Sequence, residues 1–481
     1  MPEESTDRAR VRVVVIRDVA HVIVDVVVER EVLGDHRREL LVHVFEVLAR
    51  RAHAVSAPHH HRRRTDLAFR DPTDVVLVEP RCNPGRLAEV AVGVALEVRG
   101  VGLHEEHPRL RSVKGLVLSG GAGTRLRPIT HTSAKQLVPI ANKPIIFYVV
   151  EQLVGAGITE IGIVISEGDT GDEITAAVGD GSKWDVHITY IPQDAPLGLA
   201  HCVLISHAFL GDDDFVMYLG DNMLQQDLRQ FVERFETERS RPPTLGERDR
   251  VTPAAQILLA HVSDPRQFGV AELDADGDVV RLVEKPQQPP SDLALAGVYL
   301  FDRRINDAVR SIEPSARGEL EITDAIQWLL DHDLRVVHEV LEGWWIDTGK
   351  KDPLLHCNRL VLDMLVPRTD GHVDEQSRVE GRVVIEDGAE LVNSVVRGPA
   401  IIGSRTRLVD TYVGPYTSIG PDCQLIDAEV EHSVVLASST INGVHRIQDS
   451  LLGRESEVVR SGIRPGATRL MLGDHSRVDL E

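Results

Sequence analysis

A chain of 481 residues is too long for one hydrophobic core, because domains usually hold about 100–200 residues, so we expect two to four domains. The formal net charge of −22 argues against non-specific binding to nucleic acid. No apolar run reaches the roughly 20 residues that span a bilayer, and the polar start differs from a signal peptide. We therefore expect no nucleic-acid and no membrane partner. Four scattered cysteines without a CxxC pair are typical of free thiols in a cytoplasmic protein.

Residues 1–112 form an extension whose composition differs from the rest of the chain. This segment contains no lysine, although lysine recurs from Lys114 onward. Its valine-rich run "VRVVVIRDVAHVIVDVVVER" favours strands. Two interpretations stay open: a small extra domain, or a wrongly assigned start, since a GTG start codon is written as Val when it is read internally, and Val113 stands at the right place. We assign this extension no function.

From Lys114 to Asn222 the sequence alternates between strand and helix patterns. Strands are expected at 114–120, 159–167, 186–193 and 213–222, and helices at 143–157 and 197–210. Strands separated by helices imply crossover connections and a mostly parallel sheet. The predicted fold class is therefore α/β, with a Rossmann-like sheet that binds ligands at the carboxyl ends of its strands.

The stretch "LSGGAGTRLRP" directly follows the first of these strands. It lacks the Gly-Lys-Ser/Thr ending of a Walker loop, and Leu126 stands where a dinucleotide fingerprint needs its third glycine. What remains is a glycine-rich turn whose backbone N–H groups can bind an anion, with the guanidinium of Arg125 beside it. Lys135 adds a second cation ten residues later. This combination suits a triphosphate.

A series of ordered motifs resembles the sugar-1-phosphate nucleotidylyltransferases, and especially the glucose-1-phosphate thymidylyltransferases. The motifs are "LSGGAGTRLRPIT", "AKQLVPIANKP", "QDAPLGLAHCV", "YLGDN", "FGVAELD", "VEKP", "ALAGVYLFD", "RGELEITDAI" and "WWIDTG". The resemblance covers residues 113–353. It implies transfer of a thymidylyl group from dTTP to glucose 1-phosphate, giving dTDP-glucose and pyrophosphate for deoxysugar biosynthesis. Transfer from UTP stays open, because thymine and uracil differ by one methyl group, worth ~1–3 kcal/mol in a pocket. Another hexose phosphate as acceptor also stays open, since hexoses differ by hydroxyl positions that only the pocket geometry can distinguish. A non-catalytic regulatory subunit is a less favoured alternative.

The same resemblance implies roles for individual residues. Arg125 and Lys135 would bind the triphosphate, Lys285 the sugar phosphate, and Gln193 with Gly198 the base. Asp221 and Asp347 would hold one Mg²⁺, a hard cation that prefers oxygen ligands. Further substrate-binding positions would be Gly120, Gly121, Gly123, Thr124, Asn222, Gly269, Glu284, Gly297 and Tyr299. The sugar phosphate attacks the α-phosphorus in line, so catalysis would rest mostly on charge neutralisation and alignment of two anions.

After residue 353 we expect a helical linker over 354–378 and a repetitive domain over 379–481. Aliphatic residues recur in steps of six, five and six at Ile385, Leu391, Val396, Ile402, Leu408, Val413, Ile419, Leu425, Val430 and Leu436. Three such steps make a 17-residue turn, as in the hexapeptide repeats of a left-handed parallel β-helix.

The function of this repetitive domain has two interpretations. Related coils in some bifunctional enzymes transfer acyl groups from coenzyme A with a His as base, and the candidates here are His432, His445 and His475. Scattered polar histidines are more typical of a surface. We therefore favour a structural or oligomerising role and expect a homo-oligomer.

Overall fold

The computed structural model describes residues 11–17, 22–28, 113–121, 123–131, 133–240, 252–460 and 473–479. The chain divides into two compact units, Met1–His107 and Pro108–Glu481. In the first unit, β1 (Val11–Arg17) and β2 (Val22–Val28) form an antiparallel pair in which Val11 lies opposite Val28. All other residues of the predicted extension 1–112 lie outside the described residues.

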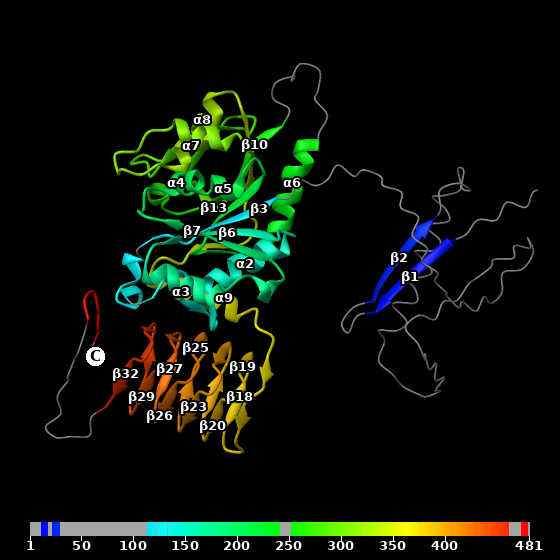
Figure 1. The fold of residues 1–481 in the computed structure, drawn as a ribbon. Coiled ribbons are helices and arrows are strands. Elements are labelled where there is room, and N and C mark those ends of the chain that lie inside the picture. Colours follow the sequence, from blue (N-terminus) through cyan, green and yellow to red (C-terminus); the bar gives the residue numbers. More distant parts are fainter. Residues whose placement is uncertain are drawn as a thin grey trace, which may run out of the picture. The chain divides into compact units, whose positions relative to one another are not determined.

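The second unit opens with a nine-stranded sheet (Figure 1). Four neighbouring strands in the order β8, β3, β6 and β7 are parallel, as the alternating pattern predicted. Antiparallel pairing begins where β13 meets β8. The strands of this sheet are β3 (Lys114–Leu118), β6 (Glu160–Ser166), β7 (His187–Gln193), β8 (Phe215–Leu219), β10 (Pro253–His261), β11 (Gly269–Leu273), β12 (Val279–Glu284), β13 (Leu293–Phe301) and β14 (Arg335–Val340). We call residues 113–353 the sheet domain.

Helices cover both faces of this sheet. Alternation along β3 explains the layers, because Leu116 and Leu118 point into one buried cluster and Val117 into the other. The first cluster is covered by α4 (Leu199–Ile205), α5 (His207–Leu210), α7 (Ile305–Ser311) and α8 (Ile322–Asp331), and the second by α2 (Ile145–Gly155), α3 (Asp169–Val178) and α6 (Leu228–Ser240). The helix expected over 197–210 is interrupted at Ser206, whose hydroxyl donates to the Cys202 carbonyl at 2.7 Å. Within the described ranges, none of the helices has the length and apolar character needed to cross a membrane.

Short elements connect the sheet to its loops. They are the 3₁₀ turns η1 (Thr124–Leu126), η2 (Ile129–His131), η3 (Lys135–Leu137), η4 (Ser182–Trp184) and η5 (Pro265–Gln267), and the strand pairs β4 (Pro139–Ile140) with β5 (Lys143–Pro144) and β9 (Asn222–Leu224) with β15 (Trp345–Asp347). The first three turns carry the chain from the glycine-rich loop to α2. The β9–β15 pair brings together two segments that lie far apart in the sequence.

At the end of the sheet domain, α9 (Lys351–Leu362) leads into three parallel sheets that wind as a coil of short strands. One sheet holds β16 (Arg368–Thr369), β19 (Val383–Ile385), β22 (Ala400–Ile402), β25 (Thr417–Ile419), β28 (Val434–Val435) and β31 (Leu451–Leu452). A second holds β17 (His372–Val373), β20 (Glu390–Val392), β23 (Arg407–Val409), β26 (Gln424–Ile426), β29 (Thr440–Asn442) and β32 (Glu457–Val459). The third holds β18 (Arg378–Glu380), β21 (Val395–Arg397), β24 (Tyr412–Val413), β27 (Glu429–Glu431) and β30 (Ile447–Gln448). We call residues 368–459 the coil.

The coil has the three-sheet layout of the left-handed parallel β-helix that the repeats predicted. Val396, Val413 and Val430 pair along one sheet at the expected spacing of 17 residues. Leu436 departs from the predicted ladder, because Val435 takes the position opposite Ile419 and Leu436 packs instead in the cluster around α9. The coil already begins at Arg368, within the expected linker 354–378.

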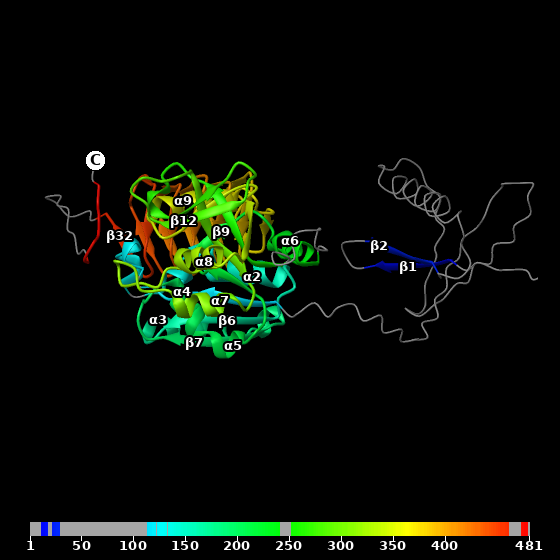
Figure 2. The same ribbon diagram turned by 90° about the horizontal axis from the view of Figure 1, so that it is seen from above.

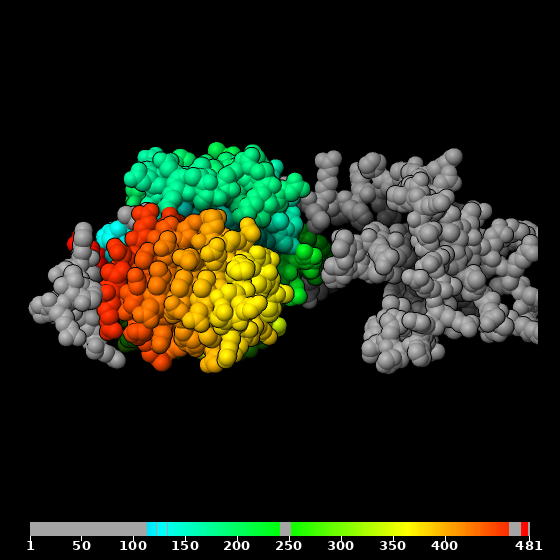
Figure 3. All heavy atoms as spheres, turned by 90° about the horizontal axis from the view of Figure 1, so that it is seen from below, coloured from blue at the N-terminus to red at the C-terminus, as the bar shows by residue number. Residues whose placement is uncertain are grey.

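The helix α9 lies next to the coil in both ribbon views (Figures 1 and 2). Through α9 the coil and the sheet domain share a buried cluster. Outward side chains of the coil join residues of α9 and residues near the glycine-rich loop, namely Val384, Ile401, Val434, Leu354, Leu355, Leu362, Leu126, Ile140 and Ile145. Asn358 of α9 is fully buried, and its Oδ1 accepts from the Ala141 N–H and the Ser418 hydroxyl, each at 2.8 Å. Seen from below, the coil lies directly against the sheet domain (Figure 3). The coil therefore supports the loops that follow β3.

Candidate active site

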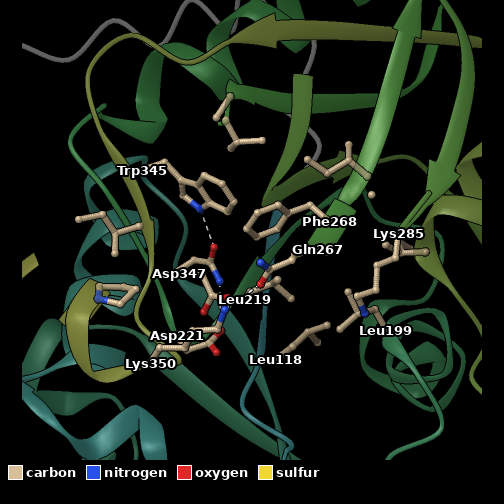
Figure 4. A pocket seen from close by; sticks show the side chains of 18 of the residues that line it. Leu118, Leu199, Leu219, Asp221, Gln267, Phe268, Lys285, Trp345, Asp347 and Lys350 are labelled. Carbon is tan, nitrogen blue, oxygen red and sulfur yellow. Dashed lines mark hydrogen bonds between the residues drawn. The ribbon is translucent and has the colours of Figure 1, made fainter. Parts of the chain in front are cut away.

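A cavity of about 1100 Å³ opens at the carboxyl ends of the parallel strands. Its lining comes from the ends of β3, β7 and β8, from the β9–β15 pair, and from the loops beside β11 and α8. Figure 4 shows Asp221, Asp347 and Lys350 toward one end of this cavity and Lys285 toward the other. We call these the carboxylate end and the Lys285 end.

Two carboxylates meet at the carboxylate end because of the β9–β15 register. Asp347 pairs with Asn222, and Asp221 immediately precedes Asn222. The Asp221 carbonyl accepts from both the N–H and the hydroxyl of Thr348, at 3.1 and 2.6 Å, which ties the two segments together. The amide of Asn222 donates to Asp221 Oδ1 at 3.1 Å and accepts from the Trp345 indole N–H at 2.6 Å.

The charges at this end shift the two carboxyl pKa values in opposite directions. Burial alone would raise the pKa of Asp221, but the Lys135 ammonium and hydrogen bonds from Lys135 and Asn222 hold it below its usual range. Burial raises the pKa of Asp347, and the negative charge of Asp221 raises it further, against opposition from the Gly349 N–H, Lys135 and Arg125. The pKa of Asp347, a partly exposed carboxyl, is therefore raised because the nearby positive charges do not offset burial and the charge of Asp221.

Two cations from the glycine-rich region face these carboxylates. Lys135 forms an ion pair with Asp221, and Arg125 Nη1 lies 3.9 Å from Asp347 Oδ2. Both cations line the cavity. Arg125 and Lys135 both lie on the segment that follows the glycine-rich loop. They are therefore placed to bind an anion at the carboxylate end.

The loop that carries Lys135 is anchored from outside the cavity. Glu173 of α3 accepts from the Ser133 hydroxyl at 2.9 Å and from the Ala134 N–H at 2.8 Å. Arg454 of the coil donates to the same carboxylate at 3.2 Å. A coil residue is therefore linked, through one carboxylate, to the residue that precedes Lys135.

Gln193, at the end of β7, is a buried amide on the cavity wall and only 6% exposed. Its Nε2 donates to His201 Nδ1 at 3.0 Å and lies 3.3 Å from the Cys202 sulfur. Its Oε1 lies so close to Gly120 that a β-carbon there would be only 2.7 Å away. Gly198 has φ of +104°, and a β-carbon would lie 2.3 Å from the Leu320 carbonyl oxygen. Both glycines therefore shape the wall at which the amide lies.

At the Lys285 end, a second group of charges surrounds Glu284. Lys285 Nζ lies 3.2 Å from Glu284 Oε1, and Arg317 donates to the same oxygen at 3.1 Å. Thr323 donates to Glu284 Oε2 at 3.3 Å. Arg317 is also held by Glu321, at 2.8 Å. Lys285 and Arg317 thus line one part of the cavity, and both contact Glu284.

Most of the predicted site residues line this single cavity. They are Gly120, Arg125, Lys135, Gln193, Gly198, Asp221, Asn222, Gly269, Glu284, Lys285, Tyr299 and Asp347. The predicted residues Gly121, Gly123, Thr124 and Gly297 are not part of its lining. Gly121 and Gly123 belong to the backbone of the loop, Thr124 begins η1, and Gly297 lies behind Asn222. The individual roles remain predictions.

Sequence reasoning did not single out Arg317, although the quoted block "RGELEITDAI" contains it. An arginine followed by Gly318, Glu319 and Glu321 resembles a solvated surface segment. Its approach to Glu284, across 33 positions, places it in the cavity. The histidines considered for acyl transfer lie at separate places. His432 is paired with Asp449, His445 lies 4.0 Å from Glu429, and the His475 ring packs against His131. They do not converge on one site.

The cysteines match the expectation of free thiols where the structure describes them. Cys202, Cys357 and Cys423 are buried and unpaired by disulfides. Burial raises the pKa of the Cys202 and Cys357 thiols to about 12. They are therefore packing residues rather than nucleophiles. Cys82 lies outside the described residues.

An α/β sheet whose carboxyl edge gathers paired carboxylates and several cations defines an enzyme that acts on phosphate-bearing substrates. The nucleotidyl transferase family matches residues 114–364. Glucose-1-phosphate thymidylyltransferases from Streptomyces antibioticus and Streptomyces griseus are each 54% identical to this chain, over 77% and 76% of it and over 100% and 99% of their own lengths. A crystal structure of a Bacillus anthracis protein in complex with a sucrose is 34% identical over 53% of this chain and 98% of its own, with a TM-score of 0.47.

This chain therefore belongs to the glucose-1-phosphate thymidylyltransferases, within the nucleotidyl transferase family.

Proposed function

We propose that this enzyme transfers a thymidylyl group from dTTP to glucose 1-phosphate, giving dTDP-glucose and pyrophosphate. The observation that carries the proposal is one cavity with cations at both ends. Arg125 and Lys135 lie beside the carboxylates near the glycine-rich loop, and Lys285 with Arg317 lies beside Glu284 at the other end. Such a cavity can hold two anionic substrates and align them. The activity named for the Streptomyces relatives supports the choice of substrates.

A main barrier to this reaction is the repulsion between the sugar phosphate and the triphosphate, both of which are anions. An oxygen of the sugar phosphate forms a bond to the α-phosphorus of the nucleotide, while the bond to the bridging oxygen breaks and pyrophosphate leaves with that electron pair. Arg125 and Lys135 bind the triphosphate and neutralise the departing pyrophosphate, and Lys285 with Arg317 fixes the attacking phosphate. Glu284 accepts from sugar hydroxyls and positions both of these cations.

Asp221 and Asp347 fit one Mg²⁺, because two carboxylates face each other and the charge of one raises the pKa of the other. Mg²⁺ needs few protein ligands, since phosphate oxygens and water complete its shell. The described residues contain no group of three or more His, Cys, Asp or Glu side chains that could hold a metal, so substrate and water oxygens would have to complete the shell. When bound, Mg²⁺ would polarise the phosphate oxygens of the substrate.

The base lies against Gln193 and Gly198 in this proposal. An amide side chain can both donate to and accept from the edge of thymine, and the surrounding bonds to His201 and Cys202 hold its orientation. Gly269 and Tyr299 line the part of the cavity next to Glu284 and belong to the sugar pocket.

The experiment that tests the proposal measures pyrophosphate release with Mg²⁺ and glucose 1-phosphate, comparing dTTP, UTP, CTP, ATP and GTP. We expect a clear preference for dTTP. A preference for UTP would replace the proposal with uridylyl transfer, and release that requires another sugar phosphate would replace the acceptor. If no pyrophosphate is released and no nucleotide binds, both thymidylyl transfer and uridylyl transfer are contradicted.

We further propose that residues 113–481 are sufficient for this activity and that the coil supports a homo-oligomer. The Streptomyces antibioticus relative aligns over its entire length with 369 residues of this chain, which supports the first statement. A chain that starts at Val113 should retain full activity, and sedimentation of that chain would report its oligomeric state. Loss of solubility or activity would show that the extension is needed.

A further inference from the structure

The cations that line the cavity differ in how they are neutralised. Arg125, Lys135, Lys285 and Arg317 each lie within 4 Å of a carboxylate. Lys350 also lines the cavity. Within the part of the chain that the structure describes, Lys350 has no carboxylate partner. Its Nζ donates instead to the neutral side-chain oxygen of Gln267, at 2.7 Å.

Lys350 is held in place by its backbone rather than by charge. It precedes α9 directly, and its carbonyl accepts the first intrahelical bond, from the Leu354 N–H at 3.0 Å. It follows Asp347 by three positions, and its side chain reaches across to Gln267 at the end of η5 (Figure 4). The side chain is exposed. A hydrogen bond to a neutral amide at such a place is readily exchanged for a stronger one to a charged oxygen.

The charges at the carboxylate end make this exchange favourable. Arg125 and Lys135 carry two positive charges and Asp221 and Asp347 two negative ones, so these four side chains cancel. Asp264 and Asp352 also line the cavity, but they lie beside Arg266 and Lys351. Among the described residues at this end, Lys350 is therefore the lining lysine with no carboxylate within 4 Å. An incoming triphosphate carries several negative charges and attracts a cation that no carboxylate already holds.

We propose that Lys350 is a further phosphate-binding residue, whose ammonium leaves Gln267 and contacts an oxygen of the triphosphate. This inference rests on the function proposed above and extends it to a residue outside the glycine-rich loop. It differs from a purely structural reading, in which Lys350 and Gln267 only fasten the loop at η5 to the start of α9.

The test compares two adjacent lysines. Lys350→Ala removes the cavity cation, whereas Lys351→Ala removes a lysine whose Nζ donates to the Asp449 carbonyl of the coil at 3.0 Å. We expect Lys350→Ala to raise the KM for dTTP, and for pyrophosphate in the reverse reaction, about 10- to 100-fold, the range for a hydrogen bond to a charged group. The KM for glucose 1-phosphate should change less than about twofold, since Lys285 binds that phosphate. Lys351→Ala should match the wild type, and Lys350→Arg should restore most of the affinity.

Gln267→Ala distinguishes the two interpretations of the contact between Lys350 and Gln267, namely a phosphate-binding lysine and a structural fastening. It removes the partner but leaves the cation, so the KM for dTTP should stay the same or fall. A Gln267→Ala variant that reproduces the loss would overturn the inference in favour of a structural fastening. Equal behaviour of Lys350→Ala and Lys351→Ala, or an effect confined to glucose 1-phosphate, would also overturn it.

Failure of the proposed function gives a different result. A wild-type enzyme that releases no pyrophosphate from dTTP would contradict that function directly. Binding of inorganic pyrophosphate, measured by calorimetry, needs no turnover and still tests Lys350. Weaker binding in Lys350→Ala than in Lys351→Ala would support the inference, and equal binding would refute it.

Discussion

Replacing Gly120 by alanine should impair recognition of the base without disturbing the fold. Gly120 follows β3 and lines the cavity. A β-carbon at this position would lie 2.7 Å from Gln193 Oε1. The amide must retreat by about 0.7 Å to reach ordinary van der Waals contact at 3.4 Å. The bonds from its Nε2 to His201, at 3.0 Å, and to Cys202, at 3.3 Å, restrict such a movement.

The size of the effect follows from these contacts. Weakening one or both hydrogen bonds costs about 1–3 kcal/mol in total. Misplacing a recognition group by nearly 1 Å lowers transition-state stabilisation by a similar free energy. We therefore expect kcat/KM for dTTP to fall by roughly 5- to 150-fold. The ratio of kcat/KM for dTTP to that for dCTP should fall as well, because an amide distinguishes thymine from cytosine by its donor and acceptor.

The assay is initial-rate release of pyrophosphate with saturating glucose 1-phosphate, together with a thermal melt. Gly155→Ala is the matched control, because Gly155 ends α2 with nothing within 4 Å of its β-carbon, and alanine there should be neutral or stabilising. A Gly120→Ala enzyme with unchanged kcat/KM and unchanged selectivity would refute the role of Gln193 in reading the base.

The remaining predictions concern the carboxylates and the coil. Asp221→Asn and Asp347→Asn should each lower kcat/KM about 10²- to 10³-fold, and wild-type rates in either variant at limiting Mg²⁺ would contradict the metal assignment. The Mg²⁺ concentration for half-maximal rate should rise as the pH falls through the raised pKa of Asp347, because Mg²⁺ binds its ionised form, and Asp221→Asn should move this rise to lower pH. Arg454→Ala, which removes the coil's contact with Glu173, should lower kcat about two- to fivefold. Arg405→Ala, which breaks an ion pair within the coil, should leave kcat unchanged, and equal rates in these two variants would refute a link between coil and loop.

Features that depend on local pattern could be predicted from the sequence. The apolar run before the glycine-rich loop predicted β3, and steps of 17 residues predicted the coil, because an inward side chain in every strand produces that spacing. The exceptions are also local. Ser206 divides an expected helix because its hydroxyl bonds to the backbone one turn earlier. Val435 replaces Leu436 inside the coil because one turn is a residue shorter.

Features that depend on distant partners could not be predicted in the same way. The sequence motifs placed Lys135 and Asp221 in one site, but their direct ion pair spans 86 positions and has no local signature. The same holds for Arg317 beside Glu284, and for Glu173 between the Lys135 loop and the coil. In each case the contact depends on packing of separate elements, which no short stretch of residues encodes.

The pairing of cations with carboxylates implies that Mg²⁺ and dTTP bind cooperatively. Lys135 forms an ion pair with Asp221, and Arg125 lies 3.9 Å from Asp347, so the side chains proposed to bind the phosphates now lie beside those proposed to bind the metal. With both ligands bound, Asp221 and Asp347 would hold the metal, and Arg125 and Lys135 would bind the phosphates. Each ligand should then tighten the other by the same factor, since linkage is reciprocal. Calorimetry of dTTP with and without Mg²⁺, and of Mg²⁺ with and without dTTP, measures this factor. Lys135→Ala removes the cation that pairs with Asp221 before any ligand binds. In this variant the factor by which Mg²⁺ and dTTP tighten each other should be smaller than in the wild type, after correction for Mg²⁺ that binds free dTTP. An unchanged factor would refute the exchange of partners.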